Sequence, residues 1–240
     1  MKNRQKQNNL DDAFYLDQVS PTPPKEYFKF IADIVDDLSC ELESWHDIGC
    51  GSGEFLNYLS ARFPGLKVSG SDVSSELIQL AGEIYPNIQF SVEDFTEVET
   101  STILPSKDVI SLVGVNGRFR YIDDWLPQFS SYIKDDGGYG LIFDLFNPEP
   151  VDVAVSASKA DSQGTNYENT YFNLVSTTSI INKLDSIGFK TSFHRFEMPF
   201  ELAKQDDPFR SWTIDLANGK RMLTNGLGQI FDLYLCVVYK

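Results

Sequence analysis

The sequence predicts one α/β domain whose mainly parallel sheet is covered by helices on both faces. Two observations carry this prediction. Through residues 44–196, short apolar runs alternate with segments whose apolar residues recur at helical spacing, a pattern typical of βαβ units. The last two predicted strands, 190–196 and 230–239, have no clear helix between them. We therefore expect the final strand to lie antiparallel among otherwise parallel neighbours.

The N-terminal part, residues 1–40, is expected to contain a polar segment and one helix. Residues 1–20 are mostly polar, and the proline-rich run P-T-P-P at 21–24 interrupts the chain. Between residues 27 and 38 the apolar side chains recur every three or four positions. This spacing predicts an amphipathic helix.

The body of the chain divides into alternating predicted strands and helices. The strands are expected at 44–48, 67–71, 88–92, 108–113, 140–145, 190–196 and 230–239. The helices are expected at 54–62, 75–84, 125–133 and 176–187. The last helix should end at Gly188, because glycine readily takes the left-handed conformation that follows many helices.

Two connections are too long for simple loops. Residues 146–175 follow the fifth strand, and residues 198–229 separate the last two strands. The second contains Asn218-Gly219 between alternating apolar residues, which is a strong signal for a β-hairpin. Long connections in a compact domain are usually functional, so both are expected on the substrate side of a single domain spanning 1–240.

The composition excludes several classes of protein. The formal net charge is −15, and the 20 basic residues form no run, so a nucleic acid is not an expected partner. No segment approaches the roughly 18 uninterrupted apolar residues of a membrane helix. The first residues, MKNRQKQNNLDD, lack the apolar stretch of a signal peptide. We therefore expect a soluble, cytoplasmic protein without membrane insertion.

The three cysteines give no sign of a metal site. Cys40, Cys50 and Cys236 are an odd, scattered set without the spacing of metal ligands. They are expected to be reduced thiols, which agrees with a cytoplasmic location. No metal is predicted.

The most informative motif is the run D-I-G-C-G-S-G at 47–53, between a predicted strand and a predicted helix. Glycine lets a bulky ligand lie against the backbone, and amide groups at the helix start face that ligand. A dinucleotide motif would read G-x-G-x-x-G/A, but the sixth position counted from Gly49 is Glu54. The turn therefore favours a nucleotide-like ligand other than a dinucleotide.

Carboxylates follow the second and third predicted strands. Asp72 stands about twenty residues after the glycines, where a carboxylate meets a ribose in doubly wound sheets. Asp72 could instead cap the following helix. The third strand ends in Glu93-Asp94-Phe95, where a carboxylate can accept from an adenine amino group beside an aromatic ring. The alternative is an ordinary polar strand end.

These three segments, in this order and spacing, resemble the class I S-adenosylmethionine-dependent methyltransferases from about residue 45 to 145. The run K-D-D-G-G at 134–138 is similar to that family's K-P-G-G turn. The resemblance implies a Rossmann-like, seven-stranded sheet of order 3-2-1-4-5-7-6 with strand seven antiparallel, and S-adenosylmethionine as cofactor. The residues that it places at the cofactor are Asp47, Gly49, Cys50, Gly51, Gly53, Asp72, Val73, Asp94, Phe95 and Val113.

Candidates for the methyl acceptor site must follow strands four, five and six. A hydroxyl acceptor needs a base, and Asp144 and His194 are the candidates. His194 could equally be an ordinary strand residue, and His46 is expected to be structural. Arg118 and Arg120 could bind an anionic acceptor or simply lie on the surface. The residues assigned to the substrate are Asn116, Arg118, Tyr121, Asn147 and Trp212.

A looser resemblance covers residues 140–240 and points to bacterial methyltransferases of surface-polysaccharide and sugar-modifying gene clusters. It implies a small-molecule acceptor, with a hydroxyl of a sugar or glycan as the methylated group. The alternatives are a protein methyltransferase, another transferase on the same fold, or a cofactor-binding module without catalysis. A monomer or homodimer is expected.

Overall fold

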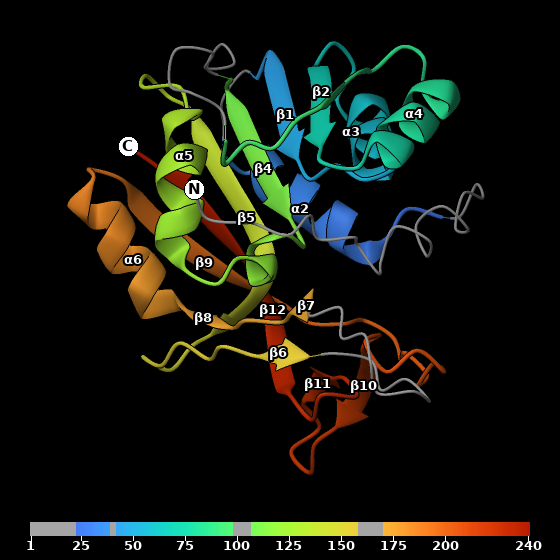
Figure 1. Cartoon of the computed structure of the whole chain (residues 1–240), viewed down its shortest axis with the longest axis vertical. Helices are drawn as coiled ribbons and strands as arrows, with labels where there is room; N and C mark the ends of the chain where they lie inside the picture. The colour runs from blue at the N-terminus through green and yellow to red at the C-terminus, as the bar shows by residue number, and fades with distance from the viewer. Residues whose placement is uncertain (1–22, 39–41, 98–106, 158–169) are drawn as a thin grey trace.

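The structure, a computed structural model, describes residues 23–38, 42–97, 107–157 and 170–240 (Figure 1). The strands are β1 (Ser44–Ile48), β2 (Lys67–Asp72), β3 (Gln89–Val92), β4 (Val109–Val113), β5 (Tyr139–Asn147), β6 (Ser156–Ala157), β7 (Thr170–Tyr171), β8 (Val175–Ser176), β9 (Lys190–Phe196), β10 (Trp212–Asp215), β11 (Arg221–Thr224) and β12 (Ile230–Tyr239). The helices are α2 (Glu26–Asp36), α3 (Glu54–Arg62), α4 (Ser75–Ile84), α5 (Leu126–Ser131) and α6 (Thr177–Ser186), with the 3-10 helices η2 (Asn116–Arg118) and η3 (Ile122–Asp124). The expected polar segment 1–20 and the middle of the connection 146–175 lie outside the described residues.

Seven strands of the main sheet follow the order β3-β2-β1-β4-β5-β12-β9. β12 runs antiparallel to both β5 and β9, whereas β1 to β5 are parallel to one another. The Rossmann-like fold and its antiparallel final strand are therefore confirmed. The count differs, because β8 pairs with the end of β5 and β10 and β11 extend the sheet beside β12. These additions give a ten-stranded sheet.

The core lies on both faces of the sheet, as the alternation of β5 shows. Leu141 packs with α2 and α3, whereas its neighbour Ile142 packs with α5 and α6. Successive side chains of a strand point to opposite faces, so a strand buried on both sides is apolar throughout. α2 buries Phe28, Ile31 and Val35, three of the apolar positions on which the predicted helix depends, and also Ala32.

One helix is shorter than its pattern indicates. Residues 125–133 read as a helix, but α5 covers only Leu126–Ser131. Trp125 takes a non-helical φ of −140° as the N-cap, and Pro127 stands in the first turn. Proline suits a helix start because it has no amide hydrogen to donate. The flanking Trp125 and Tyr132 are still buried in the core, which explains the apolar spacing beyond the helix.

The described parts of the two long connections lie beyond the carboxyl ends of the parallel strands (Figure 1). β6 and β7 pair with each other in the first connection. β10 and β11 form the hairpin that Asn218-Gly219 predicted, with Gly219 at φ +78°. The amide of Leu216 donates to the carbonyl of Lys220 at 2.8 Å, which closes the turn. The hairpin insertion between the last two strands is thus confirmed.

A buried carboxylate joins this hairpin to the sheet. Asp232 on β12 accepts from Arg195 Nε at 2.8 Å and Nη2 at 3.1 Å, and its Oδ2 lies 3.1 Å from Lys220 Nζ. β9 and β11 lie end to end along the same side of β12. Asp232 therefore pairs with Arg195 of β9 and with Lys220, which immediately precedes β11.

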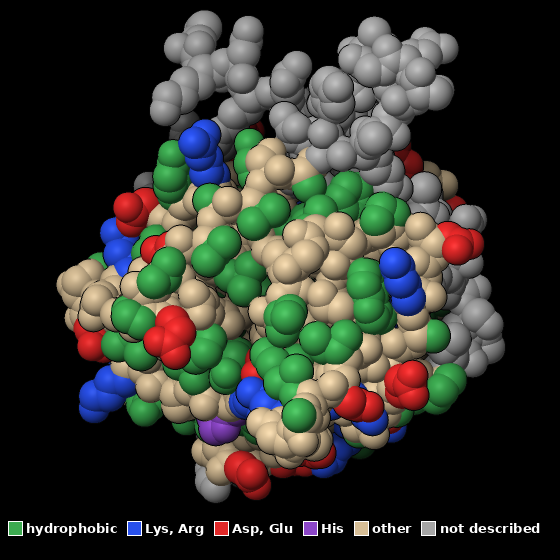
Figure 2. All heavy atoms as spheres, turned by 90° about the horizontal axis from the view of Figure 1, so that it is seen from below, with side chains coloured by type: hydrophobic (Ala, Val, Ile, Leu, Met, Phe, Trp, Pro, Cys, Tyr) green, Lys and Arg blue, Asp and Glu red, His purple; other side chains and the backbone are tan. Residues whose placement is uncertain are grey.

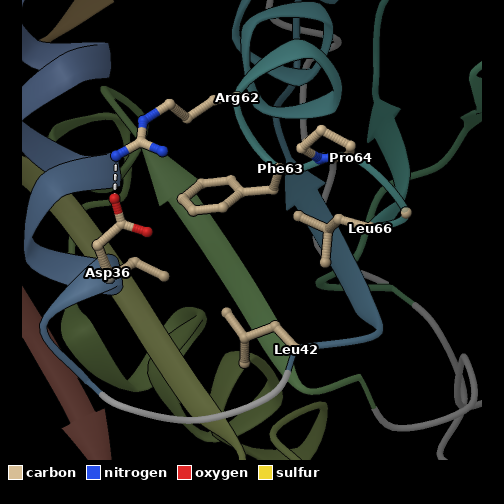
Figure 3. Close-up of a pocket in the computed structure, with 8 residues that line it drawn as sticks. Asp36, Leu42, Arg62, Phe63, Pro64 and Leu66 are labelled. Carbon is tan, nitrogen blue, oxygen red and sulfur yellow. Dashed lines mark hydrogen bonds and ion pairs between the residues drawn. The ribbon is translucent and has the colours of Figure 1, made fainter.

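A hollow of about 310 Å³ lies at the amino ends of β1 and β2 (Figure 3). Leu42 and Leu66, which precede these strands, line it together with Phe63, and an ion pair joins Arg62 to Asp36 at its side. Ligands of open α/β sheets bind at the carboxyl ends of the strands. The hollow is therefore at the wrong end of the sheet for the expected cofactor.

Candidate functional site

The glycine turn is shaped by packing at its ends and is open in its middle. A Cβ on Gly49 would come within 2.6 Å of Val115 Cγ2, and one on Gly53 within 2.7 Å of Phe90 Cζ. A Cβ on Gly51 would meet no atom within 4 Å. All three glycines have positive φ, between 54° and 82°. The outer glycines therefore allow close packing, while the middle one presents bare backbone to open space, as a bound cofactor requires.

Asp72 links the glycine turn to the start of α4. Its Oδ2 accepts from the amide of Gly51 at 2.9 Å, and its Oδ1 accepts from the amide of Ser74 at 2.9 Å. The N-cap of α4 is Ser74, whose hydroxyl accepts from the amide of Leu77 at 3.3 Å. The predicted alternative role of Asp72 as the helix cap thus belongs to Ser74. Asp72 is held rigidly beside the open glycine, where a ribose would lie.

Asp47 is buried at the end of β1 and belongs to a polar chain across two strands. Ser111 on β4 donates to Asp47 Oδ1 and accepts from Trp45 Nε1 at 2.8 Å. Burial and, to a smaller extent, the nearby charge of Asp72 together raise the pKa of Asp47 to about 7. Sequence reasoning missed Ser111, and its only signal was a polar residue inside an apolar strand.

His46 has the structural role that the sequence predicted. Its Nδ1 lies 2.9 Å from Ser69 Oγ, and its Nε2 lies 3.0 Å from Ser71 Oγ. Burial, assisted by the charge of Lys107, lowers the pKa of His46 to about 4. The ring is therefore neutral near pH 7, and its contacts with the two serines join β1 to β2 next to the glycine turn.

The residues expected around the adenine divide between surface and core. Val73 is 55% exposed beside Asp72. Asp94 is exposed, and its Oδ1 accepts from the amide of Thr96 at 3.0 Å and from its hydroxyl at 2.6 Å. Phe95 is buried and meets Phe119 edge to face at 5.7 Å. Val73 and Asp94 are accessible to a ligand, whereas Phe95 supports the site from the core.

Cys50 and Val113 complete the predicted cofactor set. The Cys50 thiol is buried against the backbone, since a Cβ on Gly70 would lie 2.8 Å from its sulfur. Burial raises the pKa of this thiol well above its usual range, so it is unreactive. Val113 ends β4 and is half-buried, and the amide of the next residue, Gly114, donates to Phe143 O at 2.8 Å. Both residues line the carboxyl end of the sheet.

On the acceptor side, Asp144 and η2 form one unit. Asp144 Oδ1 accepts from the amide of Leu145 at 2.8 Å, and Oδ2 accepts from the amide of Gly117 at 3.3 Å. Burial raises the pKa of Asp144 to about 6, although these amides and the charge of Arg118 oppose the rise. A carboxylate in this state can accept a proton near neutral pH.

Asn116, in the same unit, has unmet hydrogen-bonding groups. Its side chain is fully buried, and within the described part of the chain neither its amide oxygen nor its nitrogen has a partner. Buried polar groups nearly always have partners, and an exception needs an explanation. Asn116 follows Val115, which packs on Gly49, so it lies between the glycine turn and Asp144.

The structure does not bring His194 to Asp144. Cross-strand register aligns His194 with Leu235 and Phe143, whereas Asp144 aligns with Tyr234. Neighbouring residues of a strand point to opposite faces, so the two candidate bases lie on different faces of the sheet. His194 Nε2 lies 3.1 Å from Ser192 Oγ, on the same strand.

The remaining substrate candidates lie at different distances from this unit. Asn147 uses both side-chain atoms in the turn after β5, donating to Val151 O at 2.8 Å and accepting from Glu149 N at 3.1 Å. Tyr121 is 58% exposed on the surface. Trp212 begins the hairpin, with Lys204 Nζ 4.9 Å from its ring centre.

Sequence reasoning missed the residues that tie the first insertion to η2. The amide of Asn173 donates to Gly117 O at 3.1 Å, and its side chain donates to Phe119 O at 2.7 Å. Its Oδ1 accepts from Val155 N at 2.9 Å, so one buried asparagine holds both sides of the insertion. Only the fold brings these segments together, and no local signal marks Asn173.

The described residues contain neither a metal-binding cluster nor a membrane-spanning helix. Over the described ranges, no cluster of three or more His, Cys, Asp or Glu side chains is arranged to hold a metal ion. Over the same ranges, no helix combines the length and the apolar character needed to cross a bilayer. Independence from metal remains a prediction.

A mainly parallel sheet with an open glycine turn after its first strand defines this chain as a Rossmann-like protein. The family model described as a methyltransferase domain matches residues 24–192, more than half of the chain. The chain belongs to this family. The predicted resemblance to class I S-adenosylmethionine-dependent methyltransferases is confirmed at the level of the family.

Individual relatives match over shorter stretches. The chain is 30% identical over 142 residues to malonyl-[acyl-carrier protein] O-methyltransferase 1 of Ilyobacter polytropus, a match that covers 57% of this chain and 50% of that enzyme. It is 31% identical over 78 residues to trans-aconitate 2-methyltransferase of Variovorax paradoxus, covering 32% of this chain and 28% of that enzyme. The matches thus span half or less of the length of these curated relatives.

Similarity to solved structures extends over nearly the whole chain. 1,6-Didemethyltoxoflavin-N1-methyltransferase of Burkholderia thailandensis, solved with 1,6-didemethyltoxoflavin and S-adenosylhomocysteine, superposes with a TM-score of 0.60. The two share 13% sequence identity, and the match covers 95% of this chain and 84% of that one. At this identity the similarity establishes a common fold.

Proposed function

We propose that this chain transfers a methyl group from S-adenosylmethionine to a small molecule, and that the acceptor is a hydroxyl of a sugar or glycan. The observation that carries the proposal is the position of Asp144. This buried carboxylate is fixed by η2 beside the strand whose end packs on the glycine turn. A proton acceptor and an open cofactor turn thus share one edge of the sheet.

The residues at the turn fit the cofactor. Gly51 offers unobstructed backbone, and Asp72 lies beside it with a fixed carboxylate that can accept from ribose hydroxyls. Val73 and Asp94 are exposed where the adenine would lie. S-adenosylmethionine supplies a methyl group that its positively charged sulfur activates for transfer. The carboxylate of Asp72 gives the turn a negative charge that suits such a cation.

Asp144 would handle the proton. When the acceptor oxygen forms its bond to the methyl carbon, the bond between that carbon and the sulfur would break and leave S-adenosylhomocysteine. The hydroxyl would lose its proton to the Asp144 carboxylate, which would then release it to solvent. The raised pKa of about 6 makes Asp144 a better proton acceptor than an exposed aspartate. The amides of Leu145 and Gly117 hold the carboxylate in one orientation throughout.

A second candidate acceptor is a carboxylate oxygen. The two curated relatives named above act, by their names, on malonyl-acyl-carrier protein and on trans-aconitate, both of which carry carboxylates. A carboxylate is already deprotonated and needs no base. With a carboxylate acceptor, Asp144 would not be needed as a base and would only position the acceptor.

Methyl transfer with Asp144→Asn separates the two acceptors. Methylated products are measured by mass spectrometry after incubation with S-adenosylmethionine and either sugar nucleotides or dicarboxylic acids. For a hydroxyl acceptor we expect turnover to fall on the order of a hundredfold or more. The matched control is Asp124→Asn, which changes an exposed aspartate of η3 and should retain activity. Full turnover of a sugar hydroxyl by Asp144→Asn would contradict the assignment of the base.

A further inference from the structure

Side chains from three distant segments form a compact cluster beside Asp144, which we call the arginine–phenylalanine cluster: Arg118, Phe172, Phe209 and Arg210. The Arg118 guanidinium lies 5.3 Å from the centre of the Phe172 ring. Phe172 in turn stacks on Phe209 at 5.5 Å with an interplanar angle of 18°. Arg210 follows directly in the chain and is close enough for its charge to lower the pKa of Arg118.

The cluster concentrates positive charge in an acidic protein. The chain carries a net charge of −15, yet two guanidinium groups lie together at this point. Arg210 Nε lies 3.4 Å from Asp207 Oδ2. The acid that faces Arg118 is Asp144, whose carboxylate already accepts from two backbone amides. Desolvation lowers the pKa of Arg118, which shows that its charge is costly in this position.

The location connects the cluster to the expected methyl donor. Arg118 ends η2, and the same short helix carries Gly117, which holds Asp144, and the buried Asn116. Val115, immediately before it, packs on Gly49. A molecule bound at Arg118 would therefore lie near the glycine turn, at the end of the sheet where the described parts of both insertions lie.

The surroundings suit a polar molecule with an apolar part. Figure 2 views the end of the molecule that carries the insertions, and it shows hydrophobic side chains spread over the face with charged ones among them. Arg118 is half-buried, so part of its side chain is exposed. The Phe172 face limits the orientations of this planar group, which reduces the entropy lost when it binds.

We propose that Arg118 binds an anionic group of the acceptor, a carboxylate or a phosphate, and so orients the acceptor toward the methyl donor. This inference rests on the proposed function, because it concerns the acceptor of that methyl transfer. A guanidinium presents parallel donors that match the two oxygens of either anion. Arg210 lies close to Arg118, and Asp207 partly offsets its charge. The acceptor is thus an acidic small molecule, such as a phosphorylated sugar or an organic acid.

Binding of defined anions to the protein loaded with S-adenosylhomocysteine tests the proposal. Isothermal titration is performed with glucose 1-phosphate and with malonate, at constant ionic strength. The neutral counterparts are methyl glucoside and malonamide. We expect at least one anion to bind at millimolar concentration and its neutral counterpart to bind at least about tenfold more weakly, since the charge-assisted hydrogen bonds are lost. Which anion binds distinguishes a phosphate from a carboxylate.

Variants locate the site. Arg118→Gln should weaken anion binding at least about tenfold, and Arg118→Lys less, because lysine keeps the charge but not the paired donors. Arg120→Gln is the matched control, since the exposed Arg120 lies two residues away over the ring of Tyr121. It should leave anion binding unchanged. Titration of each variant with S-adenosylhomocysteine checks that the fold and the cofactor site are intact.

Three results would overturn the anion site: neither anion binds, the neutral compounds bind equally well, or Arg118→Gln and Arg120→Gln behave alike. A protein that methylates a neutral sugar hydroxyl but ignores both anions would refute the anion site and leave the proposed function standing. If Arg118→Gln lowers cofactor affinity as well, Arg118→Lys decides, because its anion affinity must still fall below that of the unchanged protein.

Discussion

The cofactor side and the acceptor side of this protein share one edge of the sheet, but they are held together by different contacts. At the glycine turn, backbone groups meet directly: the amides of Gly49 and Cys50 donate to Ser71 O at 2.7 and 3.0 Å. On the acceptor side, Arg118, Phe172 and Phe209 meet through side chains from three separate segments.

This difference has a physical consequence. A turn fixed by backbone hydrogen bonds and by glycine conformation requires particular residues at fixed spacing, so its sequence motif is recognisable. A pocket made from side chains on long connections can change its ligand by substitution without disturbing the sheet. We therefore expect substitutions on the cofactor side to abolish binding generally, and those on the acceptor side to change which molecule is methylated.

The largest effect should follow Gly51→Val. The added side chain would occupy the open space that the turn presents, and a β-branched residue is strained at the φ of +54° found there. We expect affinity for S-adenosylhomocysteine, measured by calorimetry, to fall on the order of a hundredfold or more. Gly82→Ala is the control, because Gly82 lies in α4 with no atom near its Cβ position. That variant should bind normally.

Asp72→Ala should produce the next largest effect. It removes the acceptor for the amides of Gly51 and Ser74 together with the expected partner of the ribose hydroxyls. We expect cofactor affinity to fall at least about tenfold, which corresponds to about 1–3 kcal/mol for polar groups left without an acceptor. Circular dichroism should show a folded protein. Unchanged cofactor affinity in a folded variant would show that Asp72 only joins the glycine turn to the start of α4 and does not bind the ribose.

On the acceptor side, Trp212→Ala or a shortened hairpin tip should give the opposite pattern. Trp212 begins the hairpin that extends the sheet beyond the carboxyl end of β5. We expect acceptor turnover to fall several-fold while affinity for S-adenosylhomocysteine stays within about threefold, since a covering hairpin excludes water and shapes the acceptor site. If both quantities fall together, or neither changes, the hairpin does not act as a lid.

The smallest effect concerns the pH dependence of stability. The folded-state pKa of Asp47 is about 7, above its ordinary value of 3.8, so folding favours the protonated form. Its contribution to stability is therefore full below about pH 4 and is lost as the pH rises toward 7. Asp47→Asn should gain stability relative to the unchanged protein over this range, measured by urea unfolding of the cofactor-free protein. His46, with its pKa lowered to about 4, acts in the opposite direction in both proteins and cancels in the difference.

The sequence alone predicted the strands and helices of the core because each carries its own local signal. The strand bounds at 44–48, 190–196 and 230–239 agree with β1, β9 and β12. Gly188 has the predicted positive φ, and Asn218-Gly219 forms the predicted hairpin. The short β6, β7 and β8 were not predicted, since two residues are too few to show a period and their pairing partners are distant in the chain.

The candidate site was predicted unevenly for the same reason. The glycine turn and Asp72 are adjacent to strand ends, so their positions followed from the alternating pattern. Ser111 and Asn173 carry no local signal, because their partners, Asp47 and the segment around Phe119, become neighbours only in the folded chain. The relative position of the two candidate bases also follows only from the strand register, which places Asp144 and His194 on opposite faces of the sheet.

By itself, then, the sequence determined the class of fold, the antiparallel last strand and the kind of cofactor turn, because these depend on periodicity and on what glycine permits. Only the tertiary structure decided which side chains surround the acceptor. Burial in the folded chain raises the pKa of Asp144 against the opposing charge of Arg118, and the Arg118 guanidinium lies over the ring of Phe172 from another segment. Burial and charge depend on neighbours in space, and a linear pattern does not contain them.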